Sequence, residues 1–310
     1  MKTMKSKFYS LALAAGMLTL TACSDDNTND SNNDKGNGIE NGSTLKGTIT
    51  EDVTLKAGNT YKLSGEYIVE AGATLNIEEG VKIISIYDNI VDYILVKQGA
   101  KINAVGTPDK PIVMTSEKEE PGAWGGIHIC GKAHTNAEGG KGSSEIGGAV
   151  YGGNDDADNS GTLQYIRLEY TGFAFDEEHE ANGISFYGVG NGTIVDHCEA
   201  YKGSDDGFEF FGGSVNVSNM VVVSCSDDSF DWTEGWNGKG TDLVAYQEAK
   251  ATLGYDCDCL IEADNNENDN AATPVSHPVL KNLILAGNGE SKQGIRLRRG
   301  TQADIDNAKV

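Results

Sequence analysis

Ser204-Asp205-Asp206-Gly207-Phe208-Glu209-Phe210-Phe211 is followed 22 residues later by Ser226-Asp227-Asp228-Ser229-Phe230-Asp231-Trp232-Thr233. A fixed internal period of this size indicates one supersecondary unit stacked on the next. The apolar-polar-apolar centre of the motif recurs upstream at 183–186 and downstream at 260–263 and 294–297. We therefore predict that successive turns of the chain lie over one another, so that Phe208 and Phe230 are vertical neighbours in one apolar stack.

A second set of short apolar strands precedes these motifs. No helical periodicity separates the two sets, which excludes a doubly wound α/β fold, because its crossovers need helices. The remaining arrangement is an all-β solenoid in which equivalent strands stack in parallel, about 4.8 Å apart, with inward side chains in apolar columns. The predicted columns are Leu163, Val195, Val217 and Leu280; Ile166, Cys198, Met220 and Leu283; and Leu168, Ala200, Val222 and Leu285.

The first residues indicate export. Three lysines precede an apolar run over 8–20, which is too short to span a bilayer and is typical of a signal peptide. The run ends in Leu20-Thr21-Ala22-Cys23, which resembles the lipobox of bacterial lipoproteins. The resemblance implies that residues 1–22 are removed, that Cys23 is acylated, and that this lipid holds the chain on a membrane. The alternative is an ordinary secretory peptide with an incidental cysteine.

Residues 23–44 are predicted to be a disordered tether. The stretch directly behind Cys23 is polar, acidic and nearly free of apolar side chains, so burial cannot offset the entropy of ordering it. An acidic stretch in this place resembles the surface-export signal of some Gram-negative lipoproteins, which implies the outer membrane and the cell surface. A plain solvated linker is the other interpretation.

The composition limits the possible partners. The formal net charge is −23, which argues against nucleic acid and anionic lipid surfaces as ligands, since both are repelled. Cations and neutral or basic ligands remain. The chain has 40 glycines but only 5 prolines, which fits many tight corners. Residues 45–310 are expected to form one solenoid domain, truncated at its C-terminal end because 303–310 reads as the opening of another coil.

The early coils carry a resemblance to a known superfamily. Segments 53–58, 68–77 and 94–102 alternate apolar and polar residues around a glycine corner, and 106–116 and 124–129 supply further strands. They resemble the early coils of right-handed parallel β-helix proteins of the pectate-lyase-like superfamily, and the resemblance extends from about Leu45 to the end. It implies a right-handed parallel β-helix. It leaves the activity open, because this scaffold hosts lyases, hydrolases, adhesins and inert surface proteins.

The central coils hold the candidate site. Stacking places Asp205 near Asp227 and Asp206 near Asp228, and two ionised carboxylates about 5 Å apart repel by roughly 3 kcal/mol at an effective dielectric of 20. Bound Ca²⁺, a shared proton or exposure to water would relieve this. Alternatively, the aspartates only shape corners by accepting backbone N–H bonds. The next outward positions predict an acidic, saccharide- or cation-binding face, with Ser185, Glu209, Asp231, Glu262 and Arg296 in one column.

Catalysis by the paired aspartates is the alternative function. The pairs resemble the paired acids of β-helix polygalacturonases and the metal-binding aspartate clusters of pectate lyases. No His-Gly follows on the next coil, however, and Arg296-Leu297-Arg298 stands where the hydrolases have Arg-Ile-Lys. A lyase needs a basic residue beside its metal, and only Lys202 is near in sequence. These departures put catalysis in doubt, and no residue is assigned a catalytic role.

Several other features carry weaker hypotheses. The non-periodic stretches 132–161 and 264–274 are predicted to be excursions from corners, which are often binding loops. Glu177-Glu178-His179-Glu180 offers metal ligands but reads more simply as a solvated loop, and Cys257-Asp258-Cys259 lacks the partners of a four-ligand site. Trp124, Trp232, Trp236, Tyr187 and Phe211 would stack on sugars only if exposed, and His197 shares a predicted corner position with Tyr165, Asn219 and Asn282.

Together these features predict a lipid-anchored surface protein with a β-helix domain. Its expected role is non-catalytic binding of extracellular material such as glycan. The alternative is a polysaccharide lyase or hydrolase that uses the stacked aspartates, with calcium as the possible cofactor. The sequence leaves the oligomeric state open.

Overall fold

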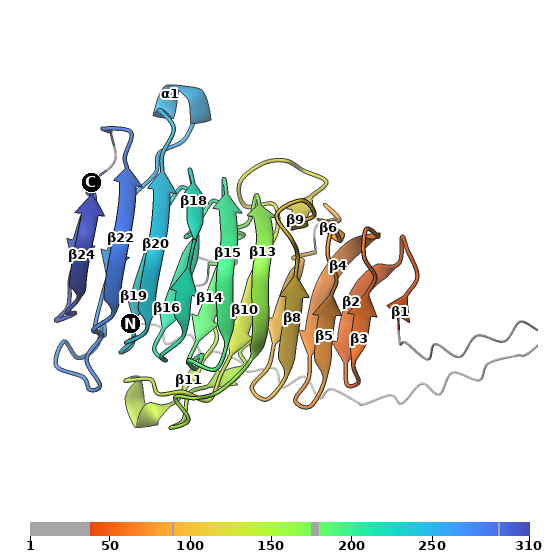
Figure 1. The fold of residues 1–310 in the computed structure, drawn as a ribbon, viewed down its shortest axis with the longest axis horizontal. Helices are drawn as coiled ribbons and strands as arrows, with labels where there is room; N and C mark the ends of the chain where they lie inside the picture. Colours follow the sequence, from red (N-terminus) through yellow and green to blue (C-terminus); the bar gives the residue numbers. More distant parts are fainter. Residues whose placement is uncertain (1–37, 89, 175–179, 291) are drawn as a thin grey trace, which may run out of the picture. The chain divides into compact units, whose positions relative to one another are not determined.

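The computed structural model describes residues 38–88, 90–174, 180–290 and 292–310. These residues form a right-handed parallel β-helix in which 22 strands join one continuous sheet (Figure 1). Helical structure in the described part is limited to a 3-10 turn, η1 (Glu138–Gly140), and α1 (Lys250–Leu253). The predicted all-β solenoid is therefore confirmed, whereas the predicted signal peptide and Cys23 lie outside the described residues.

The strands stack in three parallel columns, which we call A, B and C. Some long strands bend at a corner, so that their first part pairs in one column and their second part in the next. Those shared by A and B are β13 (Gly161–Glu169), β15 (Ile194–Tyr201), β20 (Lys239–Tyr246), β22 (Val279–Ala286) and β24 (Asp304–Lys309), and those shared by B and C are β2 (Thr44–Ile49) and β4 (Thr60–Val69).

The remaining strands of the sheet each belong to one column. Column A contains β1 (Gly38–Ile39), β3 (Val53–Leu55), β5 (Thr74–Ile77), β8 (Lys101–Val105) and β17 (Asn216–Ser218). Column B contains β6 (Lys82–Ser85), β9 (Ile112–Ser116) and β18 (Val221–Val223). Column C contains β7 (Tyr93–Val96), β10 (Ile127–Cys130), β14 (Ile184–Tyr187), β16 (Phe208–Phe211), β19 (Phe230–Thr233), β21 (Ile261–Ala263) and β23 (Ile295–Leu297).

The β-helix starts before the predicted boundary at residue 45. Strand β1 pairs in parallel with β3, and Ile39 lies opposite Leu55 and packs against the core. A single isoleucine in a polar segment carries no periodic signal, so the sequence placed these residues in the tether. Among the described residues, no helix is long and apolar enough to cross a membrane.

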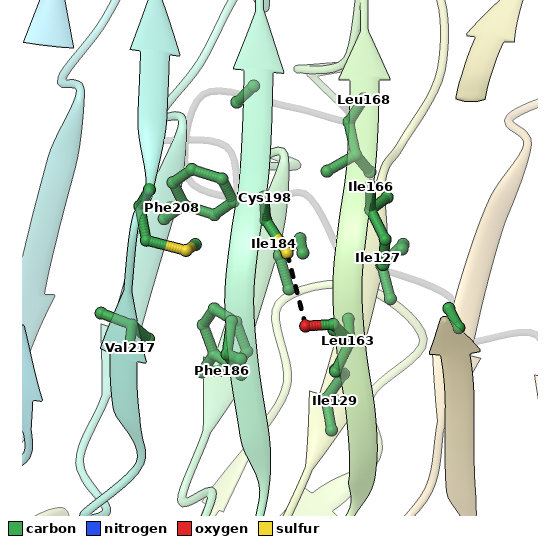
Figure 2. Close-up of a cluster of buried hydrophobic side chains, with 14 of the residues drawn as sticks. Ile127, Ile129, Leu163, Ile166, Leu168, Ile184, Phe186, Cys198, Phe208 and Val217 are labelled. Carbon is green, nitrogen blue, oxygen red and sulfur yellow. Dashed lines mark hydrogen bonds between the residues drawn. The ribbon is translucent and has the colours of Figure 1, made fainter. Parts of the chain in front are cut away.

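The 22-residue step is confirmed as the register of the coils. Phe208 lies opposite Phe230 with ring centroids 5.9 Å apart, and Glu209 lies opposite Asp231. Figure 2 shows the neighbouring inward side chains, where Leu163, Ile166, Leu168 and Cys198 project toward Phe186 and Phe208. Burying each such large side chain contributes about 1.5–3 kcal/mol to folding.

One coil was missed in the sequence. Strand β20 lies between the strands that carry Val217 and Leu280, with Gly240 in register with both. A Cβ on Gly240 would come within 2.8 Å of the Leu280 side chain and 2.9 Å of Leu243, so these leucines fill the space at this level. A glycine at the inward position gives no apolar signal to follow.

The corner between columns A and B repeats one backbone conformation. Six successive coils place a residue with φ between 52° and 58° there, namely Tyr165, His197, Asn219, Asp242, Asn282 and Asn307. The rings of Tyr165 and His197 stack at 4.4 Å, and Asn282 Nδ2 donates to Asp242 Oδ1 at 2.8 Å. The predicted corner role of His197 is therefore confirmed. Asn and Asp suit this corner because they tolerate the left-handed region better than other side-chain-bearing residues.

Candidate functional site

The paired aspartates lie at the corner that leads into column C. Asp205 and Asp206 precede β16, and Asp227 and Asp228 precede β19. Asp206 Oδ1 accepts the backbone N–H of Asp228 at 2.8 Å, and Asp228 Oδ1 in turn accepts that of Cys259 at 2.6 Å. The prediction that the aspartates shape corners by accepting backbone N–H bonds therefore holds for one oxygen of Asp206 and one of Asp228.

A small cavity of about 170 Å³, which we call the acidic cavity, adjoins this corner, and Asp205, Asp206 and Asp227 line it whereas Asp228 does not. The seven described residues that line it are all acidic: Glu145, Glu180, Asp205, Asp206, Glu209, Asp227 and Asp231. Within it, Asp206, Glu209 and Asp231 each offer an oxygen within 4.8 Å of the other two. The sequence singled out five of the seven as site candidates. Glu145 was missed because it arrives on the non-periodic excursion, and Glu180 was considered only as part of the 177–180 run.

Burial shifts the proton equilibria of this cluster strongly. Burial first, and then the Asp227 carboxylate, raises the pKa of Asp228 to about 8. Burial and the Asp258 carboxylate raise the pKa of Asp227 to about 6. The pKa values of Asp206 and Asp231 also lie well above the ordinary value, again mainly because of burial. The folded protein therefore resists full ionisation of this site unless positive charge enters it.

Two buried oxygens at this site lack hydrogen-bond donors. Asp231 Oδ1 and Asn182 Oδ1 have no hydrogen-bond partner among the described residues. The amide of Asn182 lies at the cluster, because its Nδ2 donates to Glu209 Oε2 at 2.6 Å and to Ser185 Oγ at 3.0 Å. Buried polar atoms are rarely left unsatisfied, and hard oxygen atoms around a small space are the ligands that Ca²⁺ prefers. The residues present therefore fit a divalent cation.

The neighbouring basic side chains are already paired. Arg296 Nη1 lies 2.7 Å from Glu262 Oε1, and Arg298 contacts the other oxygen of Glu262 and both oxygens of Asp264. Glu262 is consequently only 7% exposed, so it is not an open ligand-binding position as the sequence suggested. Lys202 pairs with Glu248 at 2.9 Å. In the described part of the chain, no lysine or arginine lines the acidic cavity.

A larger groove of about 1020 Å³ adjoins the acidic cavity and shares Glu145, Glu209 and Asp231 with it. Its walls come from both predicted excursions and from the ends of column C strands. Glu234, directly after β19, connects the first excursion to column C, because Thr135 Oγ1 and Tyr151 OH both donate to its Oε2 at 2.7 Å. The groove is lined from the excursions by Asn136, Ala137, Glu138, Ser143, Glu145, Tyr151, Asp264, Asn266, Glu267, Asn268, Asp269 and Ala272, and elsewhere by Tyr187, Glu209, Phe211, Asp231, Thr233, Glu234, Arg298 and Arg299.

The two excursions are bonded to each other. Asn136, from the first, donates through Nδ2 to Asn265 Oδ1 at 2.9 Å and to the Pro274 carbonyl at 3.0 Å. Asn266, from the second, donates to Asn136 Oδ1 at 2.9 Å. Both excursions therefore lie on one face, a point that the sequence left open. The groove is held in shape before any ligand enters.

The other candidates of the sequence are mostly core residues. Trp124, Trp232, Trp236 and Tyr187 are at most 1% exposed, so they are no sugar platforms, and Phe211 reaches the groove at 7% exposure. All five cysteines of the described part are buried and unpaired. Glu177, Glu178 and His179 lie outside the described residues.

A right-handed parallel β-helix with an acidic cavity beside a loop-walled groove is the class of protein that this fold and this site define. Residues 47–310 match the family model described as a pectate-lyase like beta helix domain, so the chain belongs to that family. No curated protein matches the chain. Membership in the family accounts for the fold and leaves the chemistry to the site.

Proposed function

We propose that this protein binds extracellular glycan in the groove, without cleaving it, and that a Ca²⁺ ion in the acidic cavity supports binding. We further propose that lipid on Cys23 anchors it to the outer membrane at the cell surface. The observation that carries the proposal is Asp231 Oδ1, which is buried without a hydrogen-bond partner in the described part of the chain, at a cavity whose described lining residues are all acidic.

The cation follows from the balance of charge. Two ionised carboxylates about 5 Å apart repel by roughly 3 kcal/mol at an effective dielectric of 20. Several such pairs share this cavity, and the nearby arginines are bound to Glu262 and Asp264 instead. Asp206, Glu209 and Asp231 would hold the ion, with Asn182 beside them. Bound Ca²⁺ would supply compensating charge and a point of attachment for ligand oxygens.

The glycan follows from the chemistry of the groove. Sugars present many hydroxyl groups, and the groove offers carboxylate, amide and guanidinium groups from Glu234, Asn266 and Arg299. Asn136 holds Asn266, Thr135 and Tyr151 hold Glu234, and Asp264 holds Arg299, so these groups are pre-positioned, which lowers the entropy cost of binding. The groove is continuous with the proposed cation site through Glu209 and Asp231.

Cleavage is the second candidate, favoured by the raised pKa of Asp228, about 8, which is typical of a general acid. One observation argues against a lyase. A lyase needs a basic residue, and Lys202 is held by Glu248.

The test incubates the full chain with neutral and acidic polysaccharides, with calcium or with a chelator. Bound glycan and new reducing or unsaturated ends are measured. We expect calcium-dependent binding with the glycan left intact, and a higher melting temperature with calcium, about 2.7 kcal/mol of stabilisation at one hundred times Kd. Asp231→Asn should abolish both effects, whereas Asp109→Asn, on an exposed turn, should change neither.

Degradation that disappears in Asp206→Ala would instead establish the enzyme and refute the binding-only role. The anchor is tested separately, since Cys23→Ser should move the protein out of the membrane fraction if the lipid is attached there.

A further inference from the structure

The outer face of column B is apolar in the downstream coils. Strand alternation puts every second side chain outward, and in column A the outward row of Ser218, Thr241 and Lys281 is polar. Strands β18, β20 and β22 lie side by side (Figure 1). In column B their outward residues form two short rows in register. We call them the apolar face: Val221, Val244 and Ile284 in one row, and Val223, Tyr246 and Ala286 in the other.

These side chains are accessible. Ile284 is 52% exposed and Tyr246 is 49% exposed, and the three valines are partly exposed. Strands that are apolar on both sides are typical of sheets covered on both faces, whereas one-sided sheets alternate with polar residues. The apolar face therefore has the composition of a surface that packs against another sheet.

Charge along one row indicates the partner. The row includes Glu199, Val221, Val244, Ile284 and Lys309, so an acid and a base lie two coils away from Val244 on opposite sides, and Glu199 also pairs with Arg167 of the preceding coil at 2.7 Å. A copy laid face to face with its helix axis reversed brings Val244 onto its own counterpart, Val221 onto Ile284, and Glu199 onto Lys309. The net charge of the chain is −23, so most pairs of surfaces would bring acidic side chains together, whereas two apolar faces in this arrangement do not place one acid opposite another.

We infer that the apolar face binds a second copy of this chain in a two-fold, reversed arrangement. Aligned sheets pack about 10 Å apart through such faces. A two-fold interface uses the same residues on both copies, which the symmetric row provides. Six apolar side chains per copy are few beside the 20–30 residues of a standard interface. The dimer is accordingly weak and forms at high protein concentration.

Sedimentation velocity of the full chain over a rising concentration series tests the inference. We expect a reversible monomer–dimer equilibrium. Val244→Asp should raise the dimer dissociation constant at least about tenfold, and Val244→Thr, which keeps the β-branched shape, should raise it less. Thr241→Asp is the matched control, because it places the same charge on the same strand but on the column A face. Circular dichroism and the melting temperature verify that each variant is folded.

A charge exchange tests the orientation. Lys309→Glu should weaken the dimer at low salt, and adding Glu199→Lys should restore it, even though Glu199 also pairs with Arg167 at 2.7 Å. A chain that stays monomeric at every concentration would overturn the inference. Equal effects of Val244→Asp and Thr241→Asp, or no recovery in the double variant, would overturn the proposed face or its orientation.

Discussion

At the scale of single residues, the paired aspartates at the acidic cavity couple stability to pH. Asp227 lines the cavity and Asp228 lies beside it, and their pKa values are about 6 and about 8 in the folded chain, above the ordinary 3.8, chiefly because of burial. The folded state therefore keeps protons that the unfolded chain releases. Since stability falls with pH wherever the native state binds more protons, these groups weaken the fold as pH rises from about 4 to about 8.

The resulting prediction concerns melting in the presence of a chelator. The melting temperature should fall by several degrees between pH 5 and pH 8, since each kcal/mol corresponds to about 2–4 °C for a domain of this size class. Asp228→Asn should flatten the curve, because an amide has no proton to lose, and Asp109→Asn should leave it unchanged. Differential scanning calorimetry measures both. A wild-type curve that rises over this range would contradict the assignment of raised pKa values.

At the scale of elements, the A–B corner contributes to stability through a ladder of side chains. Asn282 has φ 58°, donates to Asp242 Oδ1 at 2.8 Å and accepts from Asn307 Nδ2 at 2.8 Å. Asn282→Ala should cost about 1–2 kcal/mol, because alanine loses both bonds and tolerates the left-handed region poorly. Asn282→Gly should recover the backbone part of this loss. Urea unfolding measures the two values, and a glycine variant less stable than the alanine variant would refute the backbone argument.

At the scale of the whole molecule, the groove depends on contact between chain segments more than a hundred residues apart. Asn136→Ala removes the bonds that join the excursions and leaves buried partners unsatisfied, at about 1–3 kcal/mol. We expect faster hydrogen exchange and proteolysis over 132–160 and 264–274, with little change in the core strands. Asn237→Ala, at an exposed position, is the control. Uniform loosening of all coils would show that the excursions are not a separate unit.

The sequence by itself determined the repeat, the inward columns and the stacking of Asp205 on Asp227 and of Asp206 on Asp228. These follow from two local rules, alternation along a strand and a constant step between coils, so they can be read without knowing where the chain returns. Strand β20 was not predicted because its inward position is Gly240, which gives no apolar signal. Leu280 and Leu243 fill the space that a larger side chain would occupy there.

Only the tertiary structure decided the rest. Glu145 joins the acidic cavity and Asn136 contacts Asn265 because non-periodic segments fold back onto the coils. The position of such segments depends on long-range packing and hydrogen bonding, which no local pattern encodes. The stacked strands could be predicted and the groove could not, because a solenoid repeats its strands but not its loops.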